Sequence, residues 1–131
     1  METYKFDVII IGAGIVGLAI AHKLSEKYDN ILLVEKESSF GQHVSSRNSE
    51  VIHSGIYYDP NSLKAKLCIE GNRIMYDFAQ EHQIDHKKCG KFIVIPSDQD
   101  IDRLEILMQN GINNGLEGLQ LFTASEVHRR E

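Results

Sequence analysis

The stretch that decides the fold is residues 5–35, KFDVIIIGAGIVGLAIAHKLSEKYDNILLVE. Its opening is a nearly continuous apolar run rich in β-branched side chains, which is typical of a parallel strand covered on both faces. The run stops at Gly12, and small or apolar residues then repeat at helical spacing over residues 14–27. A polar turn and a second apolar run over residues 31–34 follow. The pattern predicts a βαβ unit over residues 1–35 and an α/β fold with a parallel, Rossmann-like sheet.

A G-x-G-x-x-G motif, formed by Gly12, Gly14 and Gly17, joins the first predicted strand to the helix. In that context the spacing predicts a dinucleotide-binding turn. We expect Gly12 to permit a tight turn, Gly14 to leave room for a pyrophosphate, and Gly17 to let the helix pack on the strand. Glu35, which ends the second strand, is expected to accept hydrogen bonds from a ribose. A carboxylate there disfavours NADP, but the motif alone does not separate FAD from NAD.

A long helix is predicted over residues 62–81, with Asn61 or Ser62 as its N-cap. Gly71 inside this helix suggests close approach of another backbone, because glycine otherwise destabilises a helix by about 1 kcal/mol. The apolar stripe expected to face the core consists of Leu63, Leu67, Ile74 and Phe78.

The remaining segment predicts two short strands, over residues 91–95 and 119–122. Between them a helix is expected to begin near Ser97, with a stripe formed by Ile101, Leu104, Met108 and Ile112. Thr123 and Glu126 then form a capping-box pattern at the start of another helix. Because the sequence ends within that helix, we expect a truncated chain of one domain, residues 1–131, that leaves sheet edge and apolar faces uncovered.

Composition excludes several classes of protein. The 131 residues carry a formal net charge of −5 with no basic run, so nucleic acid is not an expected partner. The opening residues resemble neither a signal peptide nor a membrane span. Cys68 and Cys89 predict free, mostly buried thiols, and hence a cytoplasmic location, with peripheral contact to an inner membrane left open. His82, His86 and Cys89 superficially resemble metal ligands, but no fourth ligand is near and no metal is predicted.

Residues 41–78, GQHVSSRNSEVIHSGIYYDPNSLKAKLCIEGNRIMYDF, resemble the L-2-hydroxyglutarate dehydrogenase/oxidase group of the D-amino-acid-oxidase-like FAD family. The resemblance extends from the DVIIIGAGIVGLAIA opening through KCGKFIVIP to the EVHRRE end. It implies a non-covalently held FAD and oxidation of L-2-hydroxyglutarate to 2-oxoglutarate by hydride transfer to flavin N5. Oxygen or a quinone would then accept the electrons. Members of this family are substantially longer, so most of the substrate domain is expected to be missing.

The loop over residues 36–59, with a short helical turn expected at 48–53, is predicted to serve the cofactor and active site. Hydroxyl, amide and guanidinium donors gather there and suit a pyrophosphate or a flavin carbonyl, although a solvated polar loop is the alternative. These donors belong to Ser45, Ser46, Arg47 and Asn48. His53 is the candidate catalytic base, against the alternatives of a structural histidine or a covalent flavin attachment.

Two further alternatives for the whole chain stay open. The first is another 2-hydroxy-acid or amino-acid oxidase of the same family, because no clamp for the substrate carboxylates can be identified. The second is a catalytically inactive product that binds only the ADP part of the cofactor.

Overall fold

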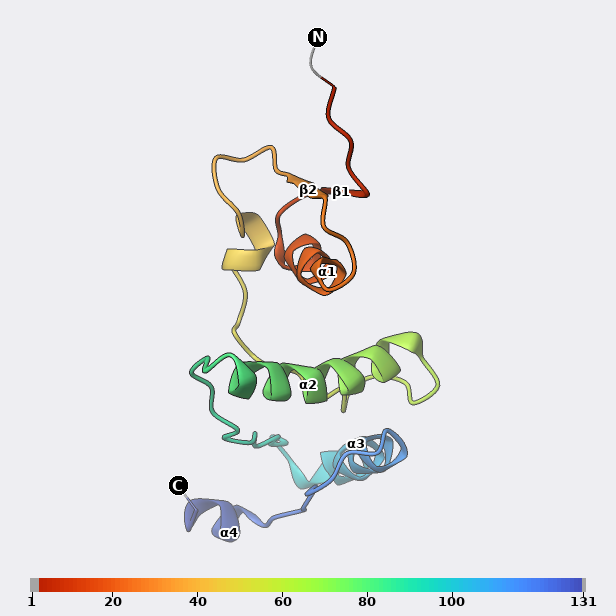
Figure 1. Cartoon of the computed structure of the whole chain (residues 1–131). Helices are drawn as coiled ribbons and strands as arrows, with labels where there is room; N and C mark the ends of the chain where they lie inside the picture. Colours follow the sequence, from red (N-terminus) through yellow and green to blue (C-terminus); the bar gives the residue numbers. More distant parts are fainter. Residues whose placement is uncertain (1–2, 131) are drawn as a thin grey trace. The chain divides into compact units, whose positions relative to one another are not determined.

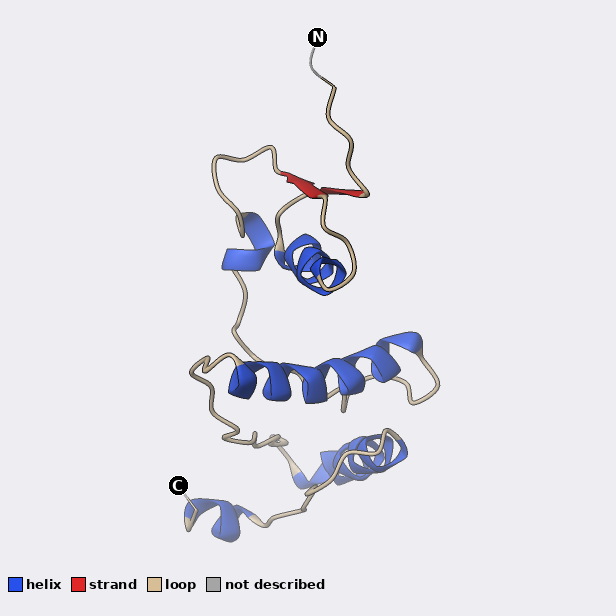
Figure 2. Ribbon diagram, in the orientation of Figure 1, coloured by secondary structure: helices blue, strands red, loops and turns tan. Residues whose placement is uncertain are grey.

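The computed structural model describes residues 3–130, in two compact units (Figures 1 and 2). The first unit is Met1–Val51 and the second is Ile52–Glu131.

The first unit is the predicted βαβ crossover. Strand β1 (Val8–Ile11) is followed by helix α1 (Ile15–Ser25) and strand β2 (Ile31–Val34). The strands pair in parallel, with Val8 opposite Ile31 and Ile11 opposite Val34. The α/β class and the parallel pairing are therefore confirmed.

The two faces of this small sheet differ in burial. Ile10 is buried, whereas Ile9 is 59% and Ile11 is 87% exposed. Side chains alternate across a strand, so one face packs and the other is open. The expectation that β1 is covered on both faces is wrong for this chain, because no described segment packs on the second face. The expected exposure of apolar helix faces is confirmed, since Ile15, Val16 and Ile20 of α1 are 65%, 69% and 45% exposed.

The loop after β2 contains one short 3-10 helix, η1 (His43–Ser46). The helical turn expected at residues 48–53 does not form, and the helical turn of this loop is η1, which lies earlier in the chain. Asn48 explains the shift, because its Nδ2 donates to the Ser45 carbonyl at 3.1 Å and its Oδ1 accepts from the Glu50 amide at 2.8 Å. The side chain thus closes the preceding turn and competes with helix formation after it.

The second unit is mainly helical. It contains α2 (Leu63–Glu81), the short 3-10 helix η2 (Asp98–Asp100), α3 (Ile101–Asn113) and α4 (Ala124–His128). The Oγ of Ser62 accepts from the Ala65 amide at 3.1 Å, which confirms the N-cap. The capping box of Thr123 and Glu126 is also confirmed.

Helix α2 does not bury the predicted stripe. Leu63, Leu67 and Ile74 are 69%, 56% and 56% exposed, whereas the buried side chains are Ala65 and Ala79. Small residues allow close packing, so the prediction that the stripe of large residues faces the core is wrong. Apart from the neighbouring backbone of α2 itself, no atom lies within 4 Å of a Cβ built on Gly71, so the predicted close approach of another backbone is also wrong. Close approach occurs at Gly111, where a Cβ would lie 2.5 Å from Leu119 Cδ1.

Residues 91–95 and 119–122, both in the described part of the chain, do not form the predicted strands. Both segments are irregular, although the Phe92 and Phe122 rings meet edge to face at 6.3 Å. A strand needs a partner for its backbone N–H and C=O groups, and neither segment pairs with another. The two strand predictions, which depended on apolar and β-branched composition, are therefore wrong. Cys89 is exposed, so the prediction of mostly buried thiols is wrong for that residue.

Candidate functional site

The glycine turn between β1 and α1 has the geometry that its spacing predicts. Gly12 has φ +101°, a conformation that favours glycine. Gly14 is the N-cap of α1 and has an extended backbone, and as a glycine it offers no side chain to cap the helix. A Cβ on Gly17 would collide with the Gly12 carbonyl. The three glycines therefore bring the helix start close to the end of β1.

Some of the backbone amides at the start of α1 donate to side-chain oxygens of the same unit. The Ile15 amide donates to Ser45 Oγ at 2.9 Å, and the Ala13 amide donates to Glu35 Oε2 at 2.6 Å. Among residues 3–130, the amides of Gly14, Val16 and Gly17 have no acceptor. Free amides at the positive end of a helix favour an anionic group.

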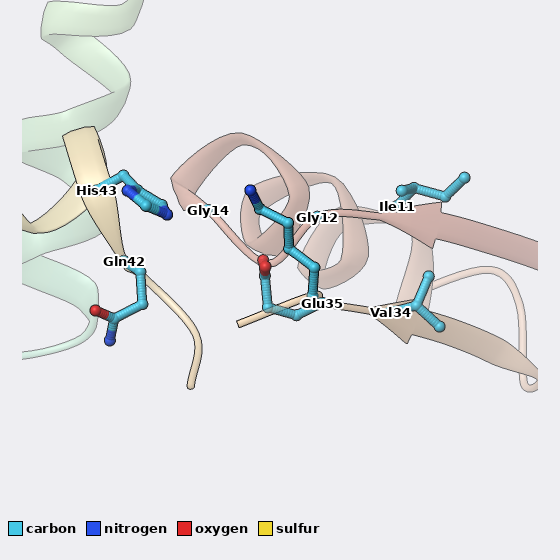
Figure 3. Close-up of a pocket in the computed structure, with 8 residues that line it drawn as sticks. Ile11, Gly12, Gly14, Val34, Glu35, Gln42 and His43 are labelled. Carbon is cyan, nitrogen blue, oxygen red and sulfur yellow. The ribbon is translucent and has the colours of Figure 1, made fainter. Parts of the chain in front are cut away.

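A pocket of about 380 Å³ lies beside this turn, at the carboxyl ends of the two strands. Figure 3 shows Ile11 and Val34 at the strand ends, with Gln42 and His43 on the loop beyond them. Its lining residues are Ile11, Gly12, Gly14, Val34, Glu35, Lys36, Gln42 and His43. The carboxyl ends of parallel strands are the usual place for ligands in α/β folds.

Both carboxylate oxygens of Glu35 accept hydrogen bonds from the backbone. Besides the Ala13 amide on Oε2, the Glu37 amide donates to Oε1 at 3.0 Å. These bonds, that from Glu37 first and that from Ala13 second, lower the pKa of Glu35. Each oxygen keeps a further lone pair, so the carboxylate can still accept from a hydroxyl.

Residues of the pocket that the sequence did not single out lie in the loop after Glu35. His43 Nε2 contacts Glu37 Oε1 at 2.9 Å, and Lys36 Nζ lies 3.4 Å from the same oxygen. The hydrogen bond from His43 is the main cause of a lowered pKa of Glu37, followed by that from Lys36. The Gly41 amide donates to the Ala13 carbonyl at 2.8 Å and ties this loop to the glycine turn. The only sequence signal was the polar GQH triplet, which is common in loops.

The predicted cluster at residues 45–48 is divided by the structure. Ser45 contacts the helix start, whereas Ser46 Oγ donates to the His43 carbonyl at 3.2 Å and Asn48 closes the turn. The Arg47 side chain is exposed and has no ion pair or hydrogen bond among the described residues. Ser45 is thus the one member that the structure brings to the glycine turn, and cofactor binding by all four stays a prediction.

His53 belongs to the second unit, where its backbone is held by α2. The His53 carbonyl accepts from Asn72 Nδ2 at 3.0 Å and from Cys68 Sγ at 3.6 Å. Its side chain is exposed. The catalytic role of His53 stays a prediction.

Asn114 is a buried residue that sequence reasoning missed. Its Nδ2 donates to the Gly55 carbonyl at 3.2 Å and to the Tyr58 carbonyl at 3.0 Å, and the residue is 9% exposed. Asn114 is also the C-cap of α3, and an asparagine before Gly115 looks in sequence like an ordinary helix end. It fixes the segment that follows His53.

Other features bear on metals and membranes. Within the described part of the chain, no three or more His, Cys, Asp or Glu side chains are grouped so that they could hold a metal ion. The His82 ring instead packs against the Phe78 ring at 4.2 Å between centroids, with the two planes tilted by 45°. No helix among residues 3–130 combines the length and apolarity needed to cross a membrane.

Comparison with known families gives a match along nearly the whole chain. Residues 7–131 match the family described as DAO, FAD dependent oxidoreductase. Mitochondrial L-2-hydroxyglutarate dehydrogenase of Arabidopsis thaliana is 46% identical over 127 residues, which are 97% of this chain and 26% of that protein. The human protein of the same description is 43% identical over 132 residues, 99% of this chain and 28% of its own length. The chain thus spans roughly a quarter of these two relatives.

A solved structure is also similar. L-alpha-glycerophosphate oxidase from Mycoplasma pneumoniae, dithionite reduced and with FAD bound, matches with a TM-score of 0.74 and 34% identity. The match covers 89% of this chain and 30% of that one.

Proposed function

This chain belongs to the FAD-dependent oxidoreductase family, and on that premise we propose that it is the FAD-binding portion of an enzyme that oxidises L-2-hydroxyglutarate to 2-oxoglutarate. The observation that carries the proposal is the identity of 43–46% to L-2-hydroxyglutarate dehydrogenases over nearly all of the chain. The glycine turn and its pocket independently support the FAD-binding part of the proposal.

The residues around the turn fit the ADP half of FAD. The free amides of Gly14, Val16 and Gly17 would bind the pyrophosphate, and the Ser45 hydroxyl lies beside them. The second lone pairs of Glu35 would accept the ribose hydroxyls. The apolar surface of Ile11 and Val34 in the pocket suits the adenine base.

When bound, FAD supplies the two-electron acceptor that turns the hydroxyl carbon of the acid into a carbonyl. This chain's part in that reaction is to hold the cofactor and to take a proton. We assign the proton transfer to His53, whose backbone is held by two contacts from α2 while its ring stays exposed. Oxygen or a quinone is the proposed final electron acceptor.

A second candidate substrate is L-alpha-glycerophosphate. The likeness to the Mycoplasma pneumoniae oxidase, at a TM-score of 0.74, favours it. The lower identity of 34%, against 43–46% for the L-2-hydroxyglutarate dehydrogenases, places it behind the first. The relatives are described as mitochondrial, and the cytoplasmic location of this chain remains a proposal from its cysteines.

The test uses a graft. This chain replaces the 127 aligned residues of the Arabidopsis relative, and product formation is measured with L-2-hydroxyglutarate, its D-enantiomer and L-alpha-glycerophosphate. We expect 2-oxoglutarate from the L-enantiomer alone. A graft carrying Gly14→Val is the control, because a branched side chain would meet Ser45 Oγ, 3.2 Å from the Cβ position, and block the pyrophosphate. Turnover of L-alpha-glycerophosphate in preference to the hydroxy acid would contradict the proposal.

The isolated chain gives a separate measurement. We expect the purified chain to bind ADP and FAD, but not to turn over L-2-hydroxyglutarate. Hydride transfer needs the reacting atoms held about 3–3.5 Å apart, and a misplacement of about 1 Å can cost on the order of 100-fold in rate. Failure to bind either nucleotide would remove the cofactor assignment.

A further inference from the structure

Within the second unit, two polar side chains far apart in sequence meet at the surface. Lys91 Nζ lies 2.9 Å from the phenolic oxygen of Tyr57, across 34 residues of sequence. Tyr57 is 55% exposed, and Lys91 is exposed as well. Lys91 forms no ion pair with any carboxylate among residues 3–130. The pair therefore presents an unneutralised positive charge beside a hydroxyl group.

The geometry distinguishes this pair from two similar contacts in the same unit. Lys88 lies 5.2 Å from the centroid of Tyr76, and Lys64 lies 4.3 Å from that of Tyr58, and neither ammonium bonds to the hydroxyl of its ring. Lys91 lies 4.6 Å from the Tyr57 centroid, a separation that its hydrogen bond to the hydroxyl of that ring already accounts for. Of these three pairs, only Lys91 and Tyr57 have the ammonium group hydrogen-bonded to the phenolic hydroxyl.

The direction of the hydrogen bond decides what the pair can bind. An ammonium group donates and cannot accept, so Lys91 donates to the Tyr57 oxygen. The Tyr57 O–H and the other N–H groups of Lys91 stay available as donors. Donation from the ammonium polarises the phenol and makes it a better donor in turn.

Two adjacent donors, one of them charged, match the two oxygens of a carboxylate. Carboxylate is favoured over phosphate because the pair carries one positive charge and no guanidinium fork, whereas phosphate sites commonly use arginine or several donors.

The position of Tyr57 is built into the fold. Asn114 donates to the carbonyls of Gly55 and Tyr58, on either side of Tyr57, and the intervening Ile56 is 8% exposed. The Tyr58 amide closes a turn onto the Gly55 carbonyl at 3.1 Å. A residue held on both sides in this way presents its hydroxyl at a defined place, as a binding group requires. His53 begins the same segment.

We propose that Tyr57 and Lys91 form a carboxylate-binding pair that takes one carboxylate of a dicarboxylic hydroxy acid and so contributes to substrate selection. The identity of the acid rests on the proposed function, whereas the pairing itself does not.

The experiment titrates the isotopically labelled 131-residue chain with glutarate, neutral glutaramide and methyl phosphate, without FAD, and follows the side-chain NMR signals of Lys91 and Tyr57. Sodium chloride at equal ionic strength is the reference. We expect saturable shifts with glutarate, none with glutaramide, and weaker binding of methyl phosphate. Lys91→Met should weaken glutarate about fivefold, and Tyr57→Phe about threefold. Lys88→Met and Tyr76→Phe are the matched controls and should leave the affinity unchanged.

The proposal is overturned if Lys91→Met and Lys88→Met give the same glutarate affinity, if glutarate shifts neither residue beyond the chloride reference, or if methyl phosphate binds more tightly than glutarate. Circular dichroism of each variant checks that the fold is kept, and exposed side chains make such changes tolerable. Since this titration needs neither flavin nor turnover, it separates the two proposals. If glutarate does not bind at Lys91 and Tyr57 but the graft still oxidises L-2-hydroxyglutarate, only this inference is removed. If glutarate binds there but the graft does not oxidise L-2-hydroxyglutarate, only the proposed function is removed.

Discussion

The two units of this chain hold their functional segments in different ways. In the first unit, the conformation of the glycine turn is set by residues close in sequence. Its long-range hydrogen bonds come from the Glu35 carboxylate, the Ser45 hydroxyl, the Gly41 amide and the Val34 carbonyl. In the second unit, the segment after His53 is fixed by the neutral amide of Asn114, 59 residues beyond Gly55. The cofactor end is therefore specified by a local motif, and the proposed substrate end by tertiary packing. The following predictions test this contrast.

The largest effect is expected at Gly17. Replacement by valine places a branched side chain against the Gly12 carbonyl and forces the helix away from β1. Overpacking costs about 1–3 kcal/mol and occasionally more, and we expect a loss above that range here because backbone cannot move aside as a flexible side chain can. We expect urea denaturation to show this loss, together with loss of ADP binding. Gly71→Ala is the control, since its Cβ would meet no atom within 4 Å and should stabilise α2 by roughly 0.5–1 kcal/mol.

Asn114→Ala should have the next largest effect on stability. It removes the side-chain donor from the Tyr58 carbonyl and leaves the Gly55 carbonyl with the Tyr58 amide alone, which we expect to lower the free energy of unfolding by about 1–3 kcal/mol. Asn113→Ala provides the comparison, because Asn113 only accepts an exposed hydrogen bond from Gln109. ADP binding by the first unit should be the same in both variants. Equal urea midpoints for the two would show that Asn114 does not hold this segment.

Glu35→Gln should weaken ADP binding about tenfold while leaving the fold intact. The amide keeps one acceptor oxygen but loses the charge that strengthens the bonds from the Ala13 and Glu37 amides and from a ribose. Isothermal titration with ADP measures the change, and Glu50→Gln, whose side chain lies outside the pocket, is the control. Unchanged ADP affinity would place the ribose elsewhere.

The smallest effect is a difference in acid sensitivity. The pKa values of Glu35 and Glu37 are lowered by the hydrogen bonds that they accept, so their stabilisation is complete above the ordinary value of 4.5 and is lost as pH falls through the lowered values. We expect the NMR signals of the Ala13 and Glu37 amides to move in that acid range. The Asn114 side-chain amide, which bonds only to carbonyls, should stay constant while the second unit remains folded. Equal movement of both sets would remove the contrast.

The sequence by itself determined the βαβ unit, the parallel pairing of its strands, the N-cap at Ser62 and the capping box at Thr123. Each of these depends on residues within a few positions of one another, or on a glycine spacing whose steric meaning is the same in every chain. Tight turns and caps can be predicted because their geometry is local.

Tertiary structure alone decided the rest. The segments at 91–95 and 119–122 have the composition of strands but pair with nothing in the described chain, and strand formation depends on a partner. Helix α2 buries Ala65 and Ala79 in place of its large apolar side chains, because packing selects the face that fits its neighbours. Asn114 and the Tyr57–Lys91 pair join residues 34 to 59 positions apart, and no pattern in the sequence specifies which distant side chains will meet.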